Sequence, residues 1–559
     1  SYWLLHDSPY SANRCRRRSL RRSERRERGG KAPEVMRILC ECRVRLLAYV
    51  LLYRLIYDVT YQTHKISNIF VINHKFFAYI CGRKINKYMY HQATEIRREL
   101  LRRVCELTFN EELEAEIDRI PLHMRPRITE LSRCCVHKDR AVIKYRVMTI
   151  LGFNVTDETD ELTRLSEYAR MSRERKDFTD VMLTVVDEAC SSCVKQNYTV
   201  TNLCKGCVGH PCTYACNKDA ITMNRRAKID PSMCVNCGRC LSACPFHAIV
   251  YTPVPCEEAC PVGAISKNDL GVEVIDWNKC VYCGKCKEAC SFGAIMEKTY
   301  LVQIAEEMKN PAKRLVAMVA PAFAGQYDQP FEKVLAAVKK SGFDEVVEVA
   351  MGANITSRKE ADEWIERVKE GGAPFMTTSC CPSYKAWAEK HLPTLVPYIS
   401  HTKSPVAYTA ESVKRSEPDS VTVFISPCIA KRVEGFYDEN IDYVITFEEM
   451  AAIIEAKGIN IEACEPQGLS SEIEKSGRYY AKTGGVANSV AQYLQEKEGF
   501  SSLVVNGLDK ESVKMLKNIA QTGKAEANMI EVMMCQGGCV NGCSTISDYK
   551  AATRRLQKI

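Results

Sequence analysis

Cysteine is the residue type that gives this sequence most of its possible chemistry. The 559 residues include 30 cysteines, and 16 of these lie between residues 190 and 290 in closely spaced runs. Cysteines spaced as Cys-x2-Cys favour metal ligation over disulfide bonds. The N-terminus lacks the charged segment, apolar run and small-residue cleavage site of a secretory signal. We therefore expect a cytoplasmic, reducing setting and iron–sulfur clusters.

Two of the cysteine runs have the C-x2-C-x2-C-x3-C spacing of bacterial ferredoxins. In this spacing three thiolates hold one cubane cluster and the fourth reaches a neighbouring cluster. A third run, spaced x2-x4-x3, is similar to a variant in multi-cluster ferredoxin subunits of larger oxidoreductases, and two remaining pairs could form a split fourth run. The runs are Cys234, Cys237, Cys240 and Cys244; Cys280, Cys283, Cys286 and Cys290; Cys204, Cys207, Cys212 and Cys216; and Cys190 and Cys193 with Cys256 and Cys260.

Crossed ligation between runs predicts four accessory [4Fe-4S] clusters, although two or three clusters, or a zinc knuckle at residues 190–207, are alternatives. Each run is followed by an Ala-Ile dipeptide four residues after its last cysteine, at 220–221, 248–249, 264–265 and 294–295. We expect each dipeptide to open a strand that covers a cluster. The predicted ligand sets are Cys204, Cys207, Cys212 and Cys244; Cys216, Cys234, Cys237 and Cys240; Cys260, Cys280, Cys283 and Cys286; and Cys190, Cys193, Cys256 and Cys290.

Three further cysteine motifs lie in the last third of the chain. They are Thr-Ser-Cys-Cys-Pro-Ser-Tyr at 378–384, Ser-Pro-Cys-Ile-Ala-Lys-Arg at 426–432, and Met-Met-Cys-Gln-Gly-Gly-Cys-Val-Asn-Gly at 533–542. Four cysteines on three loops can hold one cubane, and the paired glycines at 537–538 let the backbone approach a cofactor. Lys431 supplies a cation for an anionic cofactor ligand. Cys380 adjoins a ligand but should point elsewhere, so these residues alone indicate an iron–sulfur site with a spare thiol.

The three motifs resemble, in the same order, the signatures of [FeFe]-hydrogenases. With residues 319–326, Val-Ala-Pro-Ala-Phe-Ala-Gly-Gln, they look most like the monomeric group B branch, and the resemblance covers residue 181 to the C-terminus. It implies an H-cluster, a [4Fe-4S] cluster joined to a diiron centre that carries CO, CN and azadithiolate. The residues that it implies as cofactor-binding are Cys381, Cys428, Cys535, Cys539 as the bridge, Lys431 toward a cyanide, and Pro321.

The same resemblance implies a proton route that starts at Cys380. A thiol with a pKa of roughly 8.5 can exchange protons near neutrality. The route would continue through Glu360, Ser400, Glu363 and Arg367 to the surface. The alternative is a solvated helix face, because Glu360, Glu363 and Arg367 also fit i, i+3, i+7 surface charges. The sequence departs from the family pattern at Ser426, Val406 and Cys543, positions that the resemblance places at the diiron pocket.

Composition divides the chain into four regions. Residues 1–88 contain 19 Lys and Arg against 6 Asp and Glu, a net charge of +13, which leaves −4 for the other 471 residues. Nine arginines lie in Arg14–Arg28, so we expect a disordered or non-native extension and favour Met89 over Met36 as the start. The segment Leu46–Tyr57 is too short to span a membrane and contains Arg54.

The remaining regions are a helical segment at 89–180, a ferredoxin-type domain at 181–300 and an α/β catalytic domain at 313–559. We expect helices at Glu95–Glu106 and Glu111–Ile120, broken by Pro121 and Pro126, and two ordinary thiols at Cys134 and Cys135. Short β-branched runs alternate with helical stretches after residue 313, which predicts parallel βαβ units. The predicted strands are Leu315–Val319, Val346–Ala350, Val421–Ile425, Tyr443–Ile445 and Leu503–Val505, and the predicted helices are Phe331–Ser341 and Lys359–Glu370.

The predicted fold class is therefore α/β: a two-lobed [FeFe]-hydrogenase catalytic domain with parallel sheets, preceded by a ferredoxin-like α+β iron–sulfur domain and a helical N-terminal region. The resemblance implies reversible formation of H₂ from protons and electrons, with hydrogenase maturation factors as further partners. We expect ferredoxin as the electron donor, since no G-x-G-x-x-G motif follows a strand, and we expect neither a nucleic-acid partner nor a membrane span. The alternatives are an assembly factor without the diiron centre, a sensory or electron-transfer protein, and a ferredoxin-type subunit of another oxidoreductase.

Overall fold

The computed structural model describes residues 92–127, 133–158, 160–175, 179, 181–190, 193, 197–310, 312–494 and 499–559. The described residues belong to one compact unit, Tyr88–Ile559. The predicted basic extension, with the segment Leu46–Tyr57, lies outside the described residues. Across the described part of the chain, no helix is long and apolar enough to cross a membrane.

The first described region is helical, as predicted. Its helices are α3 (Gln92–Phe109), α4 (Leu113–Glu116), α5 (Ile120–Met124), α6 (Val136–Ile150) and α7 (Leu165–Glu174), with a 3₁₀ turn at Ile117–Arg119. The predicted breaks at Pro121 and Pro126 correspond to the start of α5 and to the segment just after its end. Pro121 lies in the first turn of α5, where the missing N–H costs nothing and the fixed φ suits a helix.

The ferredoxin-type region consists of short antiparallel strand pairs joined by one- to two-turn helices. β1 (Leu183–Val185) pairs with β8 (Ile295–Glu297), β2 (Tyr198–Val200) with β5 (Ile249–Tyr251), β3 (Ile221–Asn224) with β4 (Arg226–Ile229), and β6 (Ile265–Lys267) with β7 (Glu273–Ile275). Four of these strands begin at the isoleucine of an Ala-Ile dipeptide, so that prediction is confirmed. The helices are α8 (Asp187–Cys190), α9 (Pro211–Tyr214), α10 (Arg239–Ala243), α11 (Pro255–Ala259) and α12 (Lys285–Ala289).

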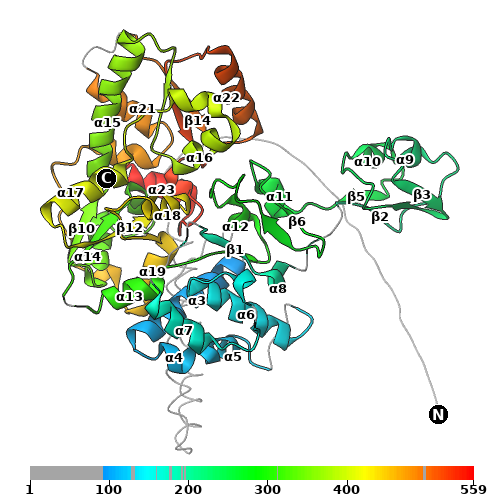
Figure 1. The fold of residues 1–559 in the computed structure, drawn as a ribbon, viewed down its shortest axis with the longest axis horizontal. Helices are drawn as coiled ribbons and strands as arrows, with labels where there is room; N and C mark the ends of the chain where they lie inside the picture. The colour runs from blue at the N-terminus through cyan, green and yellow to red at the C-terminus, as the bar shows by residue number, and fades with distance from the viewer. Residues whose placement is uncertain are drawn as a thin grey trace, which may run out of the picture. The chain divides into compact units, whose positions relative to one another are not determined.

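The last region holds two parallel sheets, which confirms the predicted two-lobed α/β class (Figure 1). One sheet has the order β10-β9-β12-β13 and the other β11-β15-β14. The strands are β9 (Leu315–Val319), β10 (Glu345–Glu348), β11 (Met376–Thr377), β12 (Val421–Ser426), β13 (Tyr443–Thr446), β14 (Ser502–Asn506) and β15 (Met529–Met533). The helices include α13 (Leu301–Glu307), α14 (Phe331–Lys340), α15 (Ala350–Trp364), α16 (Pro382–His391), α17 (Pro405–Ser416), α18 (Ala430–Phe436), α19 (Phe447–Ala456), α21 (Gly485–Tyr493), α22 (Lys510–Thr522) and α23 (Tyr549–Leu556).

Two predicted elements in this region have different bounds in the structure. The run Val346–Ala350 is not all strand, because the backbone turns helical at Val349 and α15 begins at Ala350. The predicted helix Lys359–Glu370 is the end of α15 followed by a π-helix at Ile365–Glu370. Strands β11 and β15 were not predicted, although β15 is buried along its whole length.

Candidate functional site

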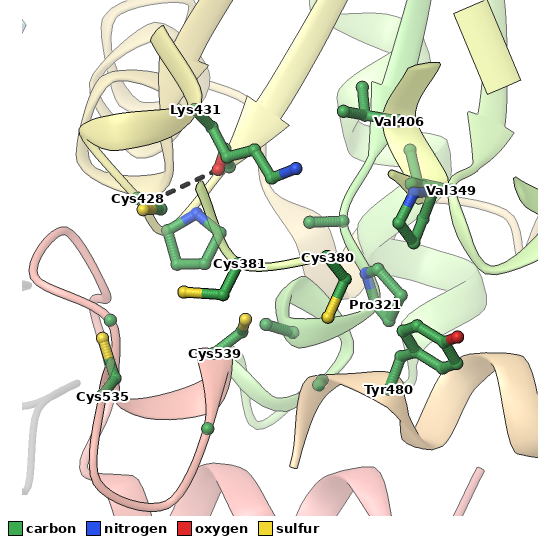
Figure 2. Close-up of a pocket in the computed structure, with 18 of the residues that line it drawn as sticks. Pro321, Val349, Cys380, Cys381, Val406, Cys428, Lys431, Tyr480, Cys535 and Cys539 are labelled. Carbon is green, nitrogen blue, oxygen red and sulfur yellow. Dashed lines mark hydrogen bonds between the residues drawn. The ribbon is translucent and has the colours of Figure 1, made fainter. Parts of the chain in front are cut away.

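The three late cysteine motifs each follow a parallel strand. β11 leads into residues 378–384, β12 into 426–432 and β15 into 533–542. Ligand sites in open α/β sheets lie beyond the carboxyl ends of the strands. The three loops line one pocket with about 840 Å³ of empty space, so side chains more than 150 residues apart meet there (Figure 2).

Five cysteine side chains line this pocket: Cys380, Cys381, Cys428, Cys535 and Cys539. Figure 2 shows the sulfur atoms of Cys381 and Cys539 near each other, with the sulfur atom of Cys380 on the side of the pocket where Pro321 and Tyr480 lie. Burial raises the pKa of the Cys381, Cys428 and Cys535 thiols. Cys539 is the most open of the five and faces the pocket. The four predicted ligands and the predicted spare thiol Cys380 therefore line the same pocket.

The backbone of the third motif is held close to the pocket by glycine. Gly537 and Gly538 have φ values of +86° and +89°, which residues other than glycine rarely adopt. A Cβ atom on Gly538 would lie 2.7 Å from the Ala481 carbonyl oxygen. The Gly537 N–H donates to Asn506 Oδ1 at 2.6 Å, which anchors the loop to the end of β14. A bulky cofactor can therefore be approached by main chain at this point.

Lys431 lies at the pocket wall with its ammonium 2.6 Å from Glu434 Oε2. Burial alone would lower the pKa of Lys431, but Glu434 and the nearby thiols raise it, so the side chain stays cationic. An ammonium has three donors, and the ion pair uses one. Lys431 can therefore still donate toward an anionic group in the pocket.

Much of the remaining wall is apolar, which excludes water from any bound group. Pro321, Val349 and Val406 line it (Figure 2). Tyr480 also lines it, and its hydroxyl is 2.9 Å from Ser357 Oγ in a buried contact. Sequence patterns gave no signal for Tyr480, since it lies in an unremarkable stretch outside the cysteine motifs.

The residues of the predicted proton route come together in the structure. Glu360 is fully buried, and its Oε1 accepts from the Ser379 N–H at 3.3 Å. Ser400 Oγ donates to Glu363 Oε2 at 2.6 Å, and Arg367 Nη1 donates to Glu363 Oε1 at 2.6 Å. The alternative of a solvated helix face does not fit Glu360, because the side chain has no exposed surface.

Burial changes the acid–base behaviour of this route. It raises the pKa of Glu360 to about 8, partly opposed by hydrogen bonds from Ser379 and Ser400. Glu360 Oε2 has no hydrogen-bond partner within the described ranges. After burial, the charge of Glu360 is the largest influence that raises the pKa of Cys380. Burial also raises the pKa of Glu363, but Ser400, the His401 N–H and Arg367 outweigh it and lower the net value.

The ferredoxin-type region contains three further cavities, each of which is lined by four cysteines. Their empty volumes are about 360, 370 and 340 Å³. The lining sets equal three of the predicted crossed sets. They are Cys204, Cys207, Cys212 and Cys244; Cys216, Cys234, Cys237 and Cys240; and Cys260, Cys280, Cys283 and Cys286.

The cysteines of the fourth predicted set lie near enough to one another for their charges to affect each other's pKa. The pKa of the Cys256 thiol is raised by burial, then by Glu273, Cys290 and Cys193. Cys190 Sγ accepts from the Glu273 N–H at 3.3 Å. The pKa of Cys190 is raised by burial and, to a smaller extent, by the charges of Cys193 and Cys290.

Backbone N–H groups are directed at several of these sulfur atoms. The N–H groups of Ala248, Ala264 and Ala294 donate to the cysteine four residues earlier at 3.4, 3.2 and 3.3 Å. Such N–H···S contacts favour a thiolate over a thiol. Of the residues described, no three His, Cys, Asp or Glu form a site for a single metal ion. A cubane is larger than one ion, and the cavities provide room for it.

One accessory cavity adjoins the catalytic loops. Gly284 lines the cavity of Cys283, and a Cβ built on it would meet Cys543 and, at 3.1 Å, Ile429 Cδ1. Next to it, Lys287 is fully buried, with its ammonium 2.9 Å from Glu297, 3.1 Å from Glu448 and 3.0 Å from Ser544. Arg97 of α3 binds the same Glu448 through two nitrogens at 2.8 and 3.0 Å. This buried charge cluster joins all three described regions.

Comparisons with known proteins identify the parts of the chain. Residues 313–543 match the family model for the iron only hydrogenase large subunit, C-terminal domain, and residues 227–250 and 273–296 match the 4Fe-4S binding domain. Iron hydrogenase 1 of Clostridium pasteurianum is 28% identical over 374 residues, which cover 56% of this chain and 64% of that protein. A cytosolic Fe-S cluster assembly factor of Kluyveromyces lactis is 24% identical over 288 residues, 38% of this chain and 60% of that protein.

Among solved structures, an apo [FeFe]-hydrogenase from Chlamydomonas reinhardtii aligns with a TM-score of 0.37 and 23% identity, over 46% of this chain and 87% of that one. The chain spans less than two thirds of the length of the two relatives above.

Proposed function

We propose that this [FeFe]-hydrogenase-like protein, with its ferredoxin-type motifs, catalyses 2H⁺ + 2e⁻ ⇌ H₂ at an H-cluster. The observation that carries the proposal is that five cysteines and the partly buried Lys431 line one pocket. A pocket for an ordinary [4Fe-4S] cluster needs neither the fifth thiol nor the lysine. The accessory cavities of this chain illustrate this, since each has four cysteines and a smaller volume.

In this proposal Cys381, Cys428, Cys535 and Cys539 would hold the cubane, and Cys539 would link it to the diiron centre. Lys431 donates toward a cyanide, and Pro321, Val349 and Val406 keep water from the diiron centre. When bound, the H-cluster supplies the redox chemistry of hydrogen, which no side chain can perform. Gly538 lines the pocket without a side chain, which leaves room for such a group.

The chain's own residues move the protons. Cys380 exchanges a proton with the pocket on one side and with Glu360 on the other. With a pKa of about 8, Glu360 can gain and lose a proton near neutral pH, whereas an ordinary glutamate would stay ionised. Ser400, Glu363 and Arg367 form the continuation toward solvent. Electrons arrive one at a time from a ferredoxin through the accessory clusters.

A second candidate function is iron–sulfur assembly without hydrogen turnover, because the Kluyveromyces lactis assembly factor matches at comparable identity. Cys380 and Lys431 at the pocket favour the enzyme, since an assembly factor without a diiron centre has no use for either. The free cysteines fit a reducing compartment, and we propose the cytoplasm.

Infrared spectroscopy of protein that has been loaded by hydrogenase maturation factors tests the proposal. We expect carbonyl and cyanide bands, together with H₂ evolution from reduced methyl viologen. The Cys539→Ala variant is the control and should lose both signals while keeping the accessory clusters. Loaded protein with intact accessory clusters but no such bands would favour the assembly function instead.

A further inference from the structure

The part of the chain from residue 197 to residue 252, here called the basic lobe, differs in charge from everything around it. It contains six Lys and Arg against two Asp, a net charge of +4. Residues 89–559 together carry −4, so the rest of that stretch carries −8. All six cationic residues of the lobe are exposed: Lys205, Lys218, Arg225, Arg226, Lys228 and Arg239. The lobe is therefore a positive region on an otherwise acidic body.

Three of these cations gather where a cysteine loop meets the turn of the β3–β4 hairpin. Gly206 has a φ of +60° and packs against the Arg225 carbonyl, so the loop that carries Lys205 lies against the turn at Arg225. Arg226 Nη1 donates to Asn202 Oδ1 at 2.8 Å, which fixes the hairpin to the same loop. These contacts bring Lys205, Arg225 and Arg226 to one place on the lobe.

Exposed apolar side chains flank the three cations. Leu203 is 57% exposed and Val208 is 97% exposed, and both belong to the loop of Cys204 and Cys207. Exposed aliphatic side chains within a ring of charge are typical of protein–protein contact sites. We call Leu203, Lys205, Val208, Arg225 and Arg226 the loop–hairpin patch.

The patch lies over one of the cysteine cavities. Ala227 and Met223 of the hairpin line the cavity of Cys204, Cys207, Cys212 and Cys244. Lys205 and Gly206 of the cysteine loop line the same cavity, so the patch adjoins this site. Cys204, Cys207 and Cys244 are only partly buried, in contrast to Cys280 and Cys290 farther along the chain. A partner on the patch would therefore be close to this cluster site.

We propose that the loop–hairpin patch is the docking surface for an acidic ferredoxin-type protein, which delivers electrons at the site of Cys204, Cys207, Cys212 and Cys244. This rests on the proposed function. In each encounter the carrier is oxidised by one electron and the cluster is reduced by one, with no bond made or broken, and two encounters supply one H₂. Charge complementarity favours an acidic partner and raises the encounter rate, while the small apolar centre suits a contact that dissociates quickly.

The test uses the full chain with its clusters loaded and an acidic [2Fe-2S] ferredoxin as the probe. The variant K205E/R225E/R226E reverses the patch. The matched control K510E/K514E/K517E makes the same charge change on the exposed face of α22 in the catalytic domain. Binding is measured by calorimetry at low ionic strength, and electron delivery is measured as H₂ evolution from the ferredoxin and, separately, from reduced methyl viologen.

We expect the patch variant to raise the Kd for ferredoxin by about tenfold or more and to flatten its dependence on salt, while the α22 control stays within about twofold. Viologen-driven H₂ evolution should be unchanged in both, since a small dye needs no docking surface. The proposal would be overturned if both variants lost affinity for ferredoxin to the same extent. It would also be overturned if the patch variant kept its affinity while its accessory-cluster absorbance was intact. If ferredoxin binds and reduces the clusters but no H₂ forms with either donor, the docking surface stands and the proposed function fails.

Discussion

Replacing Arg97 with methionine should free helix α3 from the catalytic domain far more than the same change at Arg102, although both residues lie on that helix. Arg97 is 7% exposed and its guanidinium binds Glu448 at 2.8 and 3.0 Å. Burial by itself would raise the pKa of Glu448, but Arg97, Lys287 and Arg98 hold it well below its usual range. The carboxylate is thus ionised and depends on these cations.

The size of the effect depends on which cationic partners of Glu448 remain when Arg97 is replaced. Breaking a buried ion pair costs about 3–5 kcal/mol, and Lys287 at 3.1 Å remains as a partner, so we expect about 3 kcal/mol. Arg102 makes only partly exposed pairs with Glu99 and Glu106, which are worth about 0–1 kcal/mol. Methionine preserves most of the aliphatic bulk in both variants, so the comparison isolates the charge.

Hydrogen–deuterium exchange of residues 92–109, followed by mass spectrometry, measures the local opening free energy. A loss of about 3 kcal/mol accelerates exchange by about a hundredfold, whereas 1 kcal/mol or less gives about fivefold at most. We expect the first result for R97M and the second for R102M. Similar acceleration in the two variants would show that the buried ion pair does not hold α3, and the reasoning would be refuted.

Four other outcomes are expected. In the Glu360→Gln variant, H₂ evolution should fall by about a hundredfold, because glutamine cannot pass on a proton. The remaining activity should no longer decline as the pH rises past about 8, as it should in the unmodified protein. The raised pKa of Glu360 stabilises the fold below about pH 4.5, and this stabilisation is lost as pH rises toward 8, so denaturation midpoints of the glutamine variant should vary less over that range. Cys380→Ala should keep the full iron content but lose turnover, whereas Cys381→Ala should lose the catalytic cubane; equal iron loss would contradict their separate roles. Cys244→Ala should remove about four iron atoms and the EPR signal of one accessory cluster, and unchanged iron would rule out the crossed pairing.

Spacing along the chain predicted the cysteine sites well because ferredoxin-type ligation is local. The run lengths fix which sulfur atoms can share a cubane, and the structure places three of the predicted sets around separate cavities. The strand starts after each run were predicted for the same reason. In the catalytic domain, β9 and β12 were predicted from their β-branched residues, whereas β11 is only two residues long and gave no pattern.

Long-range polar contacts could not be predicted. Arg97 and Glu448 are separated by 351 positions, and each lies among ordinary helical charges with no sign of burial. The burial of Glu360 could not be predicted from the sequence either, since a helix of mixed composition does not show which glutamate faces inward. Tyr480 lines the pocket from a segment without any motif.

The cores of the molecule have a consequence for how such a protein can diversify. Helix α3, the sites around Cys256–Cys290 and the four-stranded sheet share one continuous apolar core, which the buried charges of Arg97, Lys287 and Glu448 cross. Residues 197–252 instead have a small core of their own, around Ile221, Ile229 and Ile249. An exchange of that segment for another two-cluster insert would alter donor preference without disturbing the catalytic end. An exchange of the inner cluster segment would require compensating changes in two other regions at once, so adaptation to a new electron donor should be found in residues 197–252.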